Sequence, residues 1–281
     1  MAQVAANQDR SEAERAHYVD VQHARVTSRK GKTVHCEEIT DSRVVPTDTG
    51  SHQELLKLDG RLLHKGTYTT YTMLPAPVQS SDPPSSAPTQ NHAPIENDPH
   101  ALIISIDDGD HMDRDLVENI RSGLTNDQSR DGLGSRLFPL TSNTQLDYQF
   151  QLVGREAMNG HAVFHVTFLP KVKSDYGWKG DAFIDTVAFQ PILVRTVMSR
   201  KIPFAVRTLL GTSLPGLGFT VMYAPQLGGI WFPISFGTEF KMHVLFFLNQ
   251  EITINAENHN FEKTHVSSTI IPLTSAALPH Q

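Results

Sequence analysis

Residues 202–248, IPFAVRTLLGTSLPGLGFTVMYAPQLGGIWFPISFGTEFKMHVLFFL, decide the fold of this chain. In their second half, from Phe219 to Leu248, large apolar side chains fall on every second residue, which is typical of β-strands buried on one face. Their first half, 202–218, lacks this alternation and contains several Gly and Pro residues, which indicates a connector. The stretch therefore predicts a sheet interior preceded by an apolar connecting segment.

Turn-forming pairs on the N-terminal side of this stretch predict further hairpins. Asp59-Gly60 and Asn159-Gly160 each stand between apolar runs, and such pairs readily supply the positive φ angles of two-residue turns. A third turn is predicted at Lys30-Gly31-Lys32, and the charged runs on either side of it are predicted to be edge strands exposed on one face. Pro191 ends one ladder and begins another, so a separate strand is expected at 192–199. The sequence is thus mainly β.

One amphipathic helix is predicted at 110–122. Its apolar residues form one stripe, which indicates that it lies against a sheet; these residues are Met112, Leu116, Val117, Ile120 and Leu124. Acidic residues occupy its expected start, where they compensate the helix dipole, and Gly123 stands where a helix end is expected.

The domain organisation follows from composition. Residues 1–16 are polar and are expected to form a flexible N-terminal segment. The Pro/Ser-rich run at 75–99 has almost no large apolar residue and predicts a disordered insert, because it buries too little surface to offset its ordering entropy. We expect a single domain at 17–268 and a flexible tail at 269–281.

Charge and cysteine content exclude some classes of protein. The formal net charge is -6 and no Lys/Arg cluster is present, so a nucleic-acid partner is not expected. Cys36 is the single cysteine, which leaves no internal disulfide, and the acidic Glu37 and Glu38 beside it favour a structural residue over a nucleophile. Charged residues interrupt the most apolar region, so no membrane-spanning helix is expected.

Three groups of residues were weighed for chemistry. The acidic run at 107–115 departs from a calcium loop because Met112 stands where an oxygen donor is needed, which favours a helix start. His161 and His165 share a strand face and could hold a metal, but no third ligand lies nearby in the sequence. Ser213 lacks the glycine that a nucleophile elbow needs after the serine. We therefore expect no catalytic residue, metal or cofactor, and a protein that is not an enzyme.

Several segments together resemble a known family. These are LKLDGRLL, FQLVGREAMNGHAVFHVTFLP, WKGDAFIDTVAFQPILVRTVMS and GGIWFPISFGTEF, in this order and with a helix after the first. The order resembles the bacterial outer-membrane lipoprotein carrier superfamily, LolA/LolB-like proteins of the outer-membrane lipoprotein-sorting type. The resemblance implies an incurved antiparallel sheet that forms an unclosed half-barrel, with one or two helices packed on its concave face. It also implies acyl-chain binding in the bacterial periplasm, with a signal peptide removed from this chain.

The apolar residues of the stretch 202–248 are the ligand-binding candidates. Residues 202–218 are expected to form either a lid that touches the membrane or a buried connector, and the residues after them to line the apolar face. The candidates are Phe204, Leu209, Leu210, Leu214, Leu217, Phe219, Val221, Tyr223, Ile230, Phe232, Ile234, Phe236, Phe240, Met242 and Phe246.

The expected function is that of a non-enzymatic carrier of a lipid or lipoprotein acyl chain, with a transient membrane or envelope-protein partner. The alternative is an envelope protein-interaction or sensor module whose core is filled and holds no lipid. A metal-dependent hydrolase built on residues 107–115 is a third hypothesis.

Overall fold

The structure is a computed structural model, and it describes residues 1–47, 51–74, 112–124, 138–172, 178–198, 212–213, 217–226, 228–244 and 248–264. Its helices are α1 (Ala2–Arg15), α2 (Met112–Leu124) and α3 (Ser142–Gln145). Its strands are β1 (Tyr18–Lys30), β2 (Thr33–Pro46), β3 (Ser51–His64), β4 (Thr67–Met73), β5 (Tyr148–Met158), β6 (His161–Pro170), β7 (Trp178–Asp185), β8 (Pro191–Met198), β9 (Thr212–Ser213), β10 (Gly218–Pro225), β11 (Trp231–Val244) and β12 (Leu248–Lys263).

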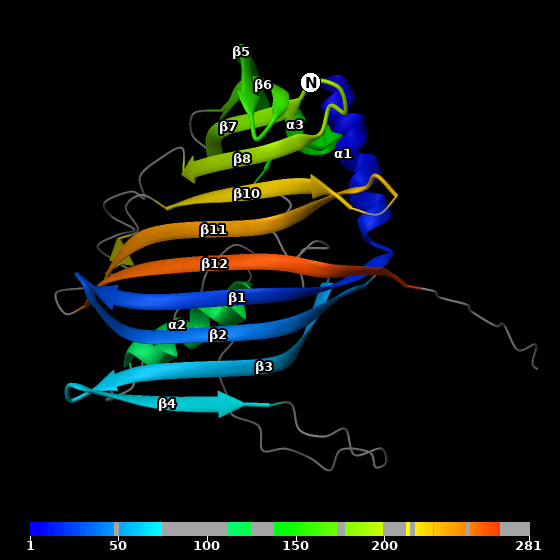
Figure 1. Ribbon diagram of the computed structural model, residues 1–281. Helices are drawn as coiled ribbons and strands as arrows, with labels where there is room; N and C mark the ends of the chain where they lie inside the picture. The colour runs from blue at the N-terminus through cyan, green and yellow to red at the C-terminus, as the bar shows by residue number, and fades with distance from the viewer. Residues whose placement is uncertain are drawn as a thin grey trace, which may run out of the picture.

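All strands in the described part of the chain belong to one antiparallel sheet. It has 12 strands, and its order is β4-β3-β2-β1-β12-β11-β10-β8-β7-β6-β5, with β9 paired to β11 off this path. Figure 1 shows β4 at one end and β5 at the other, so the sheet is not closed into a barrel. The mainly β, unclosed half-barrel expected from the sequence is confirmed.

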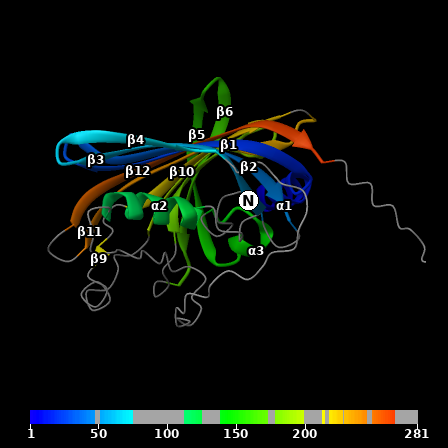
Figure 2. The same ribbon diagram turned by 90° about the horizontal axis from the view of Figure 1, so that it is seen from below.

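The three helices lie on one side of the sheet, which we call the concave face. Figure 2 shows α2 beneath one half of the sheet, and α1 with α3 beneath the other. The expected helix at 110–122 is present as α2, and its Leu116, Val117 and Ile120 are at most 1% exposed. It continues one residue beyond Gly123, where the sequence predicted its end.

The strands near the N-terminus lie inside the sheet, which corrects one expectation. β1 lies between β2 and β12, and β2 lies between β1 and β3, so neither is the edge strand predicted from its charges. Their charged side chains form cross-strand pairs instead, such as Arg29 with Glu251 at 2.8 Å and Arg61 with Glu37 at 3.0 Å. These ion pairs lie on the face of the sheet opposite the helices. The face toward the helices is buried.

Two of the three predicted hairpin turns are confirmed. Gly31 has a φ of 58° between β1 and β2, and Asn159 and Gly160 have φ angles of 50° and 83° between β5 and β6. Positive φ at both central residues is the signature of the turn whose twist matches the flanking strands. Pro191 begins the separate strand β8, as predicted.

The third predicted turn, at Asp59-Gly60, is wrong. β3 runs through both residues, and the chain turns at Lys65 and Gly66, whose φ angles are 48° and 81°. Gly60 is needed because the ring of Tyr71 lies across the strand from it, and a Cβ there would come within 2.1 Å of the ring. The glycine permits a close approach and not a turn.

Residues 1–16, expected to be a flexible segment, include the helix α1 (Ala2–Arg15). α1 buries Val4 and Ala5, and its Gln8 and Ser11 bond the buried Gln190. The buried surface of α1 has weak hydropathy because it consists of small and amide side chains. The polar composition of the segment therefore did not predict this contact. The proposed domain at 17–268, the insert at 75–99 and the tail at 269–281 stay predictions, since 75–111 and 265–281 lie outside the described residues.

Gly60→Ala is expected to lower the free energy of unfolding by about 1–3 kcal/mol, because its methyl group overlaps the Tyr71 ring. Gly154→Ala is the matched control, since a Cβ at that strand glycine meets nothing within 4 Å. Urea unfolding of both variants measures the difference. Equal stability of the two variants would contradict the proposed reason for Gly60.

Candidate functional site

The concave face is built from rows of side chains that follow the strand register across the sheet. The central row is almost entirely apolar and joins nine strands. It runs through Leu58, Thr40, Ala24, Ala256, Phe236, Val221, Val194, Ala182 and Val166. Seven of its members belong to the buried core, and the small Ala24, Ala256 and Ala182 keep the face shallow between larger residues.

A second row beside it has a polar end and an aromatic end. Its polar end contains Tyr71, Gly60 and Glu38. Its aromatic end runs from Phe219 through Thr196 and Gly180 to Phe168 and Phe150. The concave face is therefore divided into two chemically different halves.

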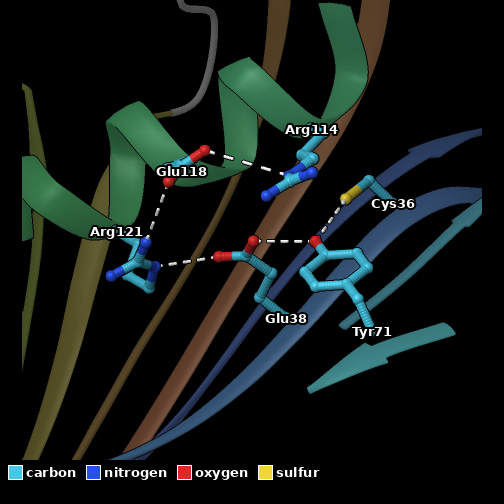
Figure 3. A network of polar contacts seen from close by, with 6 residues as sticks. All are labelled: Cys36, Glu38, Tyr71, Arg114, Glu118 and Arg121. Atoms are coloured by element: carbon cyan, nitrogen blue, oxygen red, sulfur yellow. Dashed lines mark hydrogen bonds and ion pairs between the residues drawn. The ribbon is translucent and has the colours of Figure 1, made fainter. Parts of the chain in front are cut away.

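The polar half is covered by α2 and held by a buried carboxylate. Glu38 is 2% exposed, and its Oε2 lies 2.8 Å from Nε of Arg121 on α2. The hydroxyl of Tyr71 on β4 donates to the other oxygen, Oε1, at 2.8 Å. Figure 3 shows these groups converging from β2, β4 and α2. A buried carboxylate is costly unless it is paired and hydrogen-bonded, and here both conditions are met.

Cys36 lies beside this network and is a structural residue. Its side chain is 0% exposed, and its Sγ is 3.9 Å from the Tyr71 hydroxyl. Burial, with a smaller contribution from the charge of Glu38, raises the pKa of the thiol to about 12. Because the thiolate is the reactive form, this environment makes Cys36 unreactive near neutral pH.

A second polar contact holds the start of α2. One carboxylate oxygen of Asp113 accepts from Ser28 at 3.1 Å and from the amide of Gln250 at 2.7 Å. The other oxygen lies 3.1 Å from Nδ1 of His35. The described part of the acidic run at 107–115 therefore fixes a helix to the sheet. Among the described residues, no group of three or more His, Cys, Asp or Glu side chains is arranged to hold a metal ion.

The aromatic half carries a group of rings that we call the aromatic patch. Its members are Tyr148, Phe150, Phe168, Trp178, Phe219 and Phe236. The Phe219 ring centroid lies 5.0 Å from that of Trp178 in an edge contact and 5.3 Å from that of Phe236 in a stacked one, and Tyr148 and Phe150 contact Phe168. Phe168 and Phe236 are buried, whereas the other four rings are half-buried. Part of this apolar surface thus remains open to solvent or to a ligand.

The structure places the predicted candidates unevenly. Val221, Tyr223, Phe236 and Phe240 lie in the main hydrophobic core, and Leu217 and Phe219 pack against it. Ile230 is half-buried next to the turn before β11. Phe204, Leu209, Leu210, Leu214 and Phe246 lie outside the described residues, and only the backbone of Met242, in β11, is described. The lid or connector at 202–218 therefore stays a prediction.

The predicted common face for Ile230, Phe232, Ile234 and Phe236 is interrupted. The register shifts between Met222 and Tyr223, so that Ile234 is an extra residue with no partner in β10. The ring centroid of Phe232 lies 5.1 Å from that of Tyr18 and 4.4 Å from that of Phe261. Phe232 therefore belongs to a different group of rings from the Phe219–Phe236 pair. The alternation predicts one strand through Phe236 and another from Phe240, whereas residues 231–244 form the single strand β11. A bulge cannot be read from alternation, because it interrupts that same alternation.

Sequence reasoning did not include two groups among the site residues. Trp178 contacts Phe219, and Tyr148 and Phe150 contact Phe168, only because the strand order β10-β8-β7-β6-β5 brings these strands together. The Glu38–Arg121 pair was also not predicted, because the two residues are 83 positions apart in the sequence. Both groups depend on long-range pairing that local patterns do not contain.

His161 and His165 bind separate carboxylates. Nδ1 of His161 lies 3.0 Å from Asp185. His165 lies 2.8 Å from Glu156 through Nδ1 and 2.8 Å from Asp181 through Nε2. A neutral imidazole has one N–H, and ionised carboxylates only accept, so the two contacts of His165 require the protonated ring. Hydrogen bonds to Asp181 and Glu156 accordingly raise the pKa of His165, although burial opposes them.

No family model matches the sequence, and no curated protein matches it. Solved structures that are similar include a DUF1329 family protein from Desulfovibrio piger, with 10% identity, 94% of this chain and 92% of that chain covered, and a TM-score of 0.38. A putative outer membrane lipoprotein-sorting protein domain from Vibrio parahaemolyticus has 10% identity, coverage of 94% and 93%, and a TM-score of 0.37.

A LolA superfamily protein from Nitrosomonas europaea has 10% identity, coverage of 95% and 94%, and a TM-score of 0.36. The names of the second and third structures include the lipoprotein-sorting and LolA types that the sequence resembles.

Arg121→Met is expected to lower the free energy of unfolding by about 3–5 kcal/mol, because it leaves the charge of Glu38 buried without its cation. Adding Glu38→Gln should recover part of this loss, since the uncompensated charge disappears. Glu118→Gln is the control on the same helix; its side chain is 44% exposed, and its loss should cost less than about 1 kcal/mol. Denaturant unfolding of the three variants and the wild type tests the pair, and equal effects of Arg121→Met and Glu118→Gln would refute it.

The His165 cluster predicts a pH-dependent contribution to stability. The folded-state pKa is raised above the unfolded value, so the stabilisation is complete below about pH 6.5 and is lost as pH rises through the folded pKa. The difference in unfolding free energy between the wild type and His165→Gln should therefore be larger at about pH 5.5 than at about pH 9. His161→Gln serves as the control for loss of a histidine on the same face. A difference that grows with pH would contradict the assignment.

Proposed function

We propose that this protein binds the acyl chain of a lipid or lipoprotein on the aromatic half of its concave face, without catalysing a reaction. The observation that carries the proposal is the aromatic patch, in which four of six rings remain half-buried on the inner face of an unclosed sheet. Apolar surface of this kind gains free energy when it is covered, and rings flanked by small residues fit a flexible hydrocarbon chain.

A carrier requires binding that is strong but reversible. Burial of an acyl chain gains roughly 0.8 kcal/mol per CH₂, and a bilayer offers nearly the same gain. Transfer between protein and membrane is then close to balanced, so that a small change in the protein decides its direction. This balance suits a protein of the bacterial periplasm that passes its cargo to a membrane or an envelope protein. No described helix is long and apolar enough to cross a membrane.

The alternative is an envelope protein-interaction or sensor module without lipid. The polar half of the concave face favours it, because α2 already fills that half through Leu116, Val117 and Ile120 and through the Arg121–Glu38 pair. The two functions differ in whether the aromatic half is occupied by a ligand when the protein is isolated.

Phe219→Gln is expected to weaken binding of a fluorescent fatty acid by about ten-fold, because it removes the ring that contacts both Trp178 and Phe236. Val187→Gln, at a residue 86% exposed in the turn after β7, is the control and should bind as the wild type does. Fluorescence titration measures both, and native mass spectrometry of the wild type should show co-purified lipid. Protein that is free of lipid and does not bind the probe would overturn the carrier proposal in favour of the interaction module.

A further inference from the structure

The two ends of the sheet differ in how they are protected against pairing with another strand. β5, at one end, contains a register shift between Leu152 and Gly154 and carries the charged Arg155 and Glu156. Bulges and charges at an edge are common protections against strand addition. β4, at the other end, has the sequence TYTTYTM, with no charged residue and no proline.

The β4 edge is regular and exposed. Its seven residues pair with β3 without any register shift, from Leu58 with Met73 to His64 with Thr67. Among the described residues, β4 pairs with β3 alone, and Figure 1 shows it as the last strand of the sheet. All of its residues except Tyr71 are exposed. Thr and Tyr are also among the residues that fit strands best.

The hairpin geometry identifies which backbone groups face outward. The two-residue turn at Lys65 and Gly66 is flanked by the pair His64–Thr67, and such a flanking pair is a hydrogen-bonded one. Hydrogen-bonded and non-hydrogen-bonded pairs alternate along an antiparallel ladder. Tyr68, Thr70 and Thr72 therefore occupy the non-hydrogen-bonded pairs, and their N–H and C=O groups point away from β3.

The side chains of β4 are already held in place. The Tyr68 hydroxyl donates to the carbonyl of Val34 at 2.9 Å, and Thr72 donates to Asp59 at 2.9 Å. On the concave side Tyr71 is fixed by Glu38. Binding at this edge would thus order few additional side chains, which lowers the entropic cost of association.

We propose that β4 pairs with β4 of a second copy of this chain, antiparallel and about a two-fold axis at Thr70. This axis places Thr70 opposite Thr70 and Tyr68 opposite Thr72, so that every outward N–H and C=O of Tyr68, Thr70 and Thr72 gains a partner. It also places Thr69 opposite Tyr71. Aromatic–β-branched and Thr–Thr pairs are favourable across strands.

The second copy is the occupant that the charges and the pattern favour. Neither β4 carries a charge, so no like charges meet across the axis. About the axis at Thr70 each Tyr of β4 faces a Thr of the other copy, so the two strands are complementary to each other, as a two-fold interface requires. Because the strand is short, the contact is smaller than a standard interface, and the dimer should form reversibly in the micromolar range.

Sedimentation velocity over a range of concentrations tests the dimer. The wild type is expected to shift from monomer to dimer as concentration rises. Thr70→Lys and Thr70→Glu should each raise the dissociation constant about ten-fold or more, because each places like charges directly opposite one another. An equimolar mixture of the two variants should dimerise again, since Lys then faces Glu across the axis. Gln151→Lys on the β5 edge is the control and should dimerise as the wild type does.

Three results would overturn the proposal: a wild type that stays monomeric at several hundred micromolar (roughly the limit of a specific strand contact), a dimer unaffected by Thr70→Lys, or a mixture that does not recover. A monomeric wild type that instead binds an extended peptide at β4 would point to a different protein as the partner. Circular dichroism of the Thr70 variants checks that they remain folded, which is expected for an exposed position.

Discussion

The buried carboxylate of Glu38 fixes the relative positions of three elements. It lies in the concave face of β2, and it is tolerable there only because Arg121 of α2 and Tyr71 of β4 both reach it. The apolar stripe of α2 by itself would permit several positions along the sheet, because apolar packing has little directionality. The ion pair and the Asp113 contacts at the other end of the helix select one position. Specificity of this kind is the best-supported role of buried polar groups.

Local patterns predicted the elements of this fold well where each element depends on its own residues. The Asn159-Gly160 turn needs positive φ at both positions, and the sequence supplies the two residues that adopt it best. The α2 stripe likewise depends on spacing alone. The turn predicted at Asp59-Gly60 was wrong because Gly60 has another role there. It leaves room for the Tyr71 ring on the neighbouring strand, and the order of residues in the sequence does not show this.

The candidate site was predictable only in part for the same reason. Alternation placed Phe219 and Phe236 on the apolar faces of two successive strands, and their rings stack in the structure. It could not show that Trp178 joins them, since this requires β7 to lie beside β8 and β8 beside β10. The bulge at Ile234 then separated Phe232 from the residues with which it alternates. Strand order and bulges are properties of the whole sheet, so they lie beyond any single run of sequence.

The division of the concave face restricts where a hydrocarbon ligand can bind under the proposed function. A chain placed over Glu38 would have to displace Arg121 or Tyr71, and it would leave a carboxylate in contact with CH₂ groups that cannot hydrogen-bond. The aromatic half imposes no such cost, because its exposed surface is ring edges and faces. A chain there would lie along β7, β8 and β10, beside Gly180, where a Cβ would fall 1.8 Å from the carbonyl oxygen of Arg195. Because β7 and β8 approach closely at this glycine, which has no side chain, the face is shallow at this position between Phe168 and Phe219. The backbone contact between the two strands therefore also shapes the surface that a ligand would occupy.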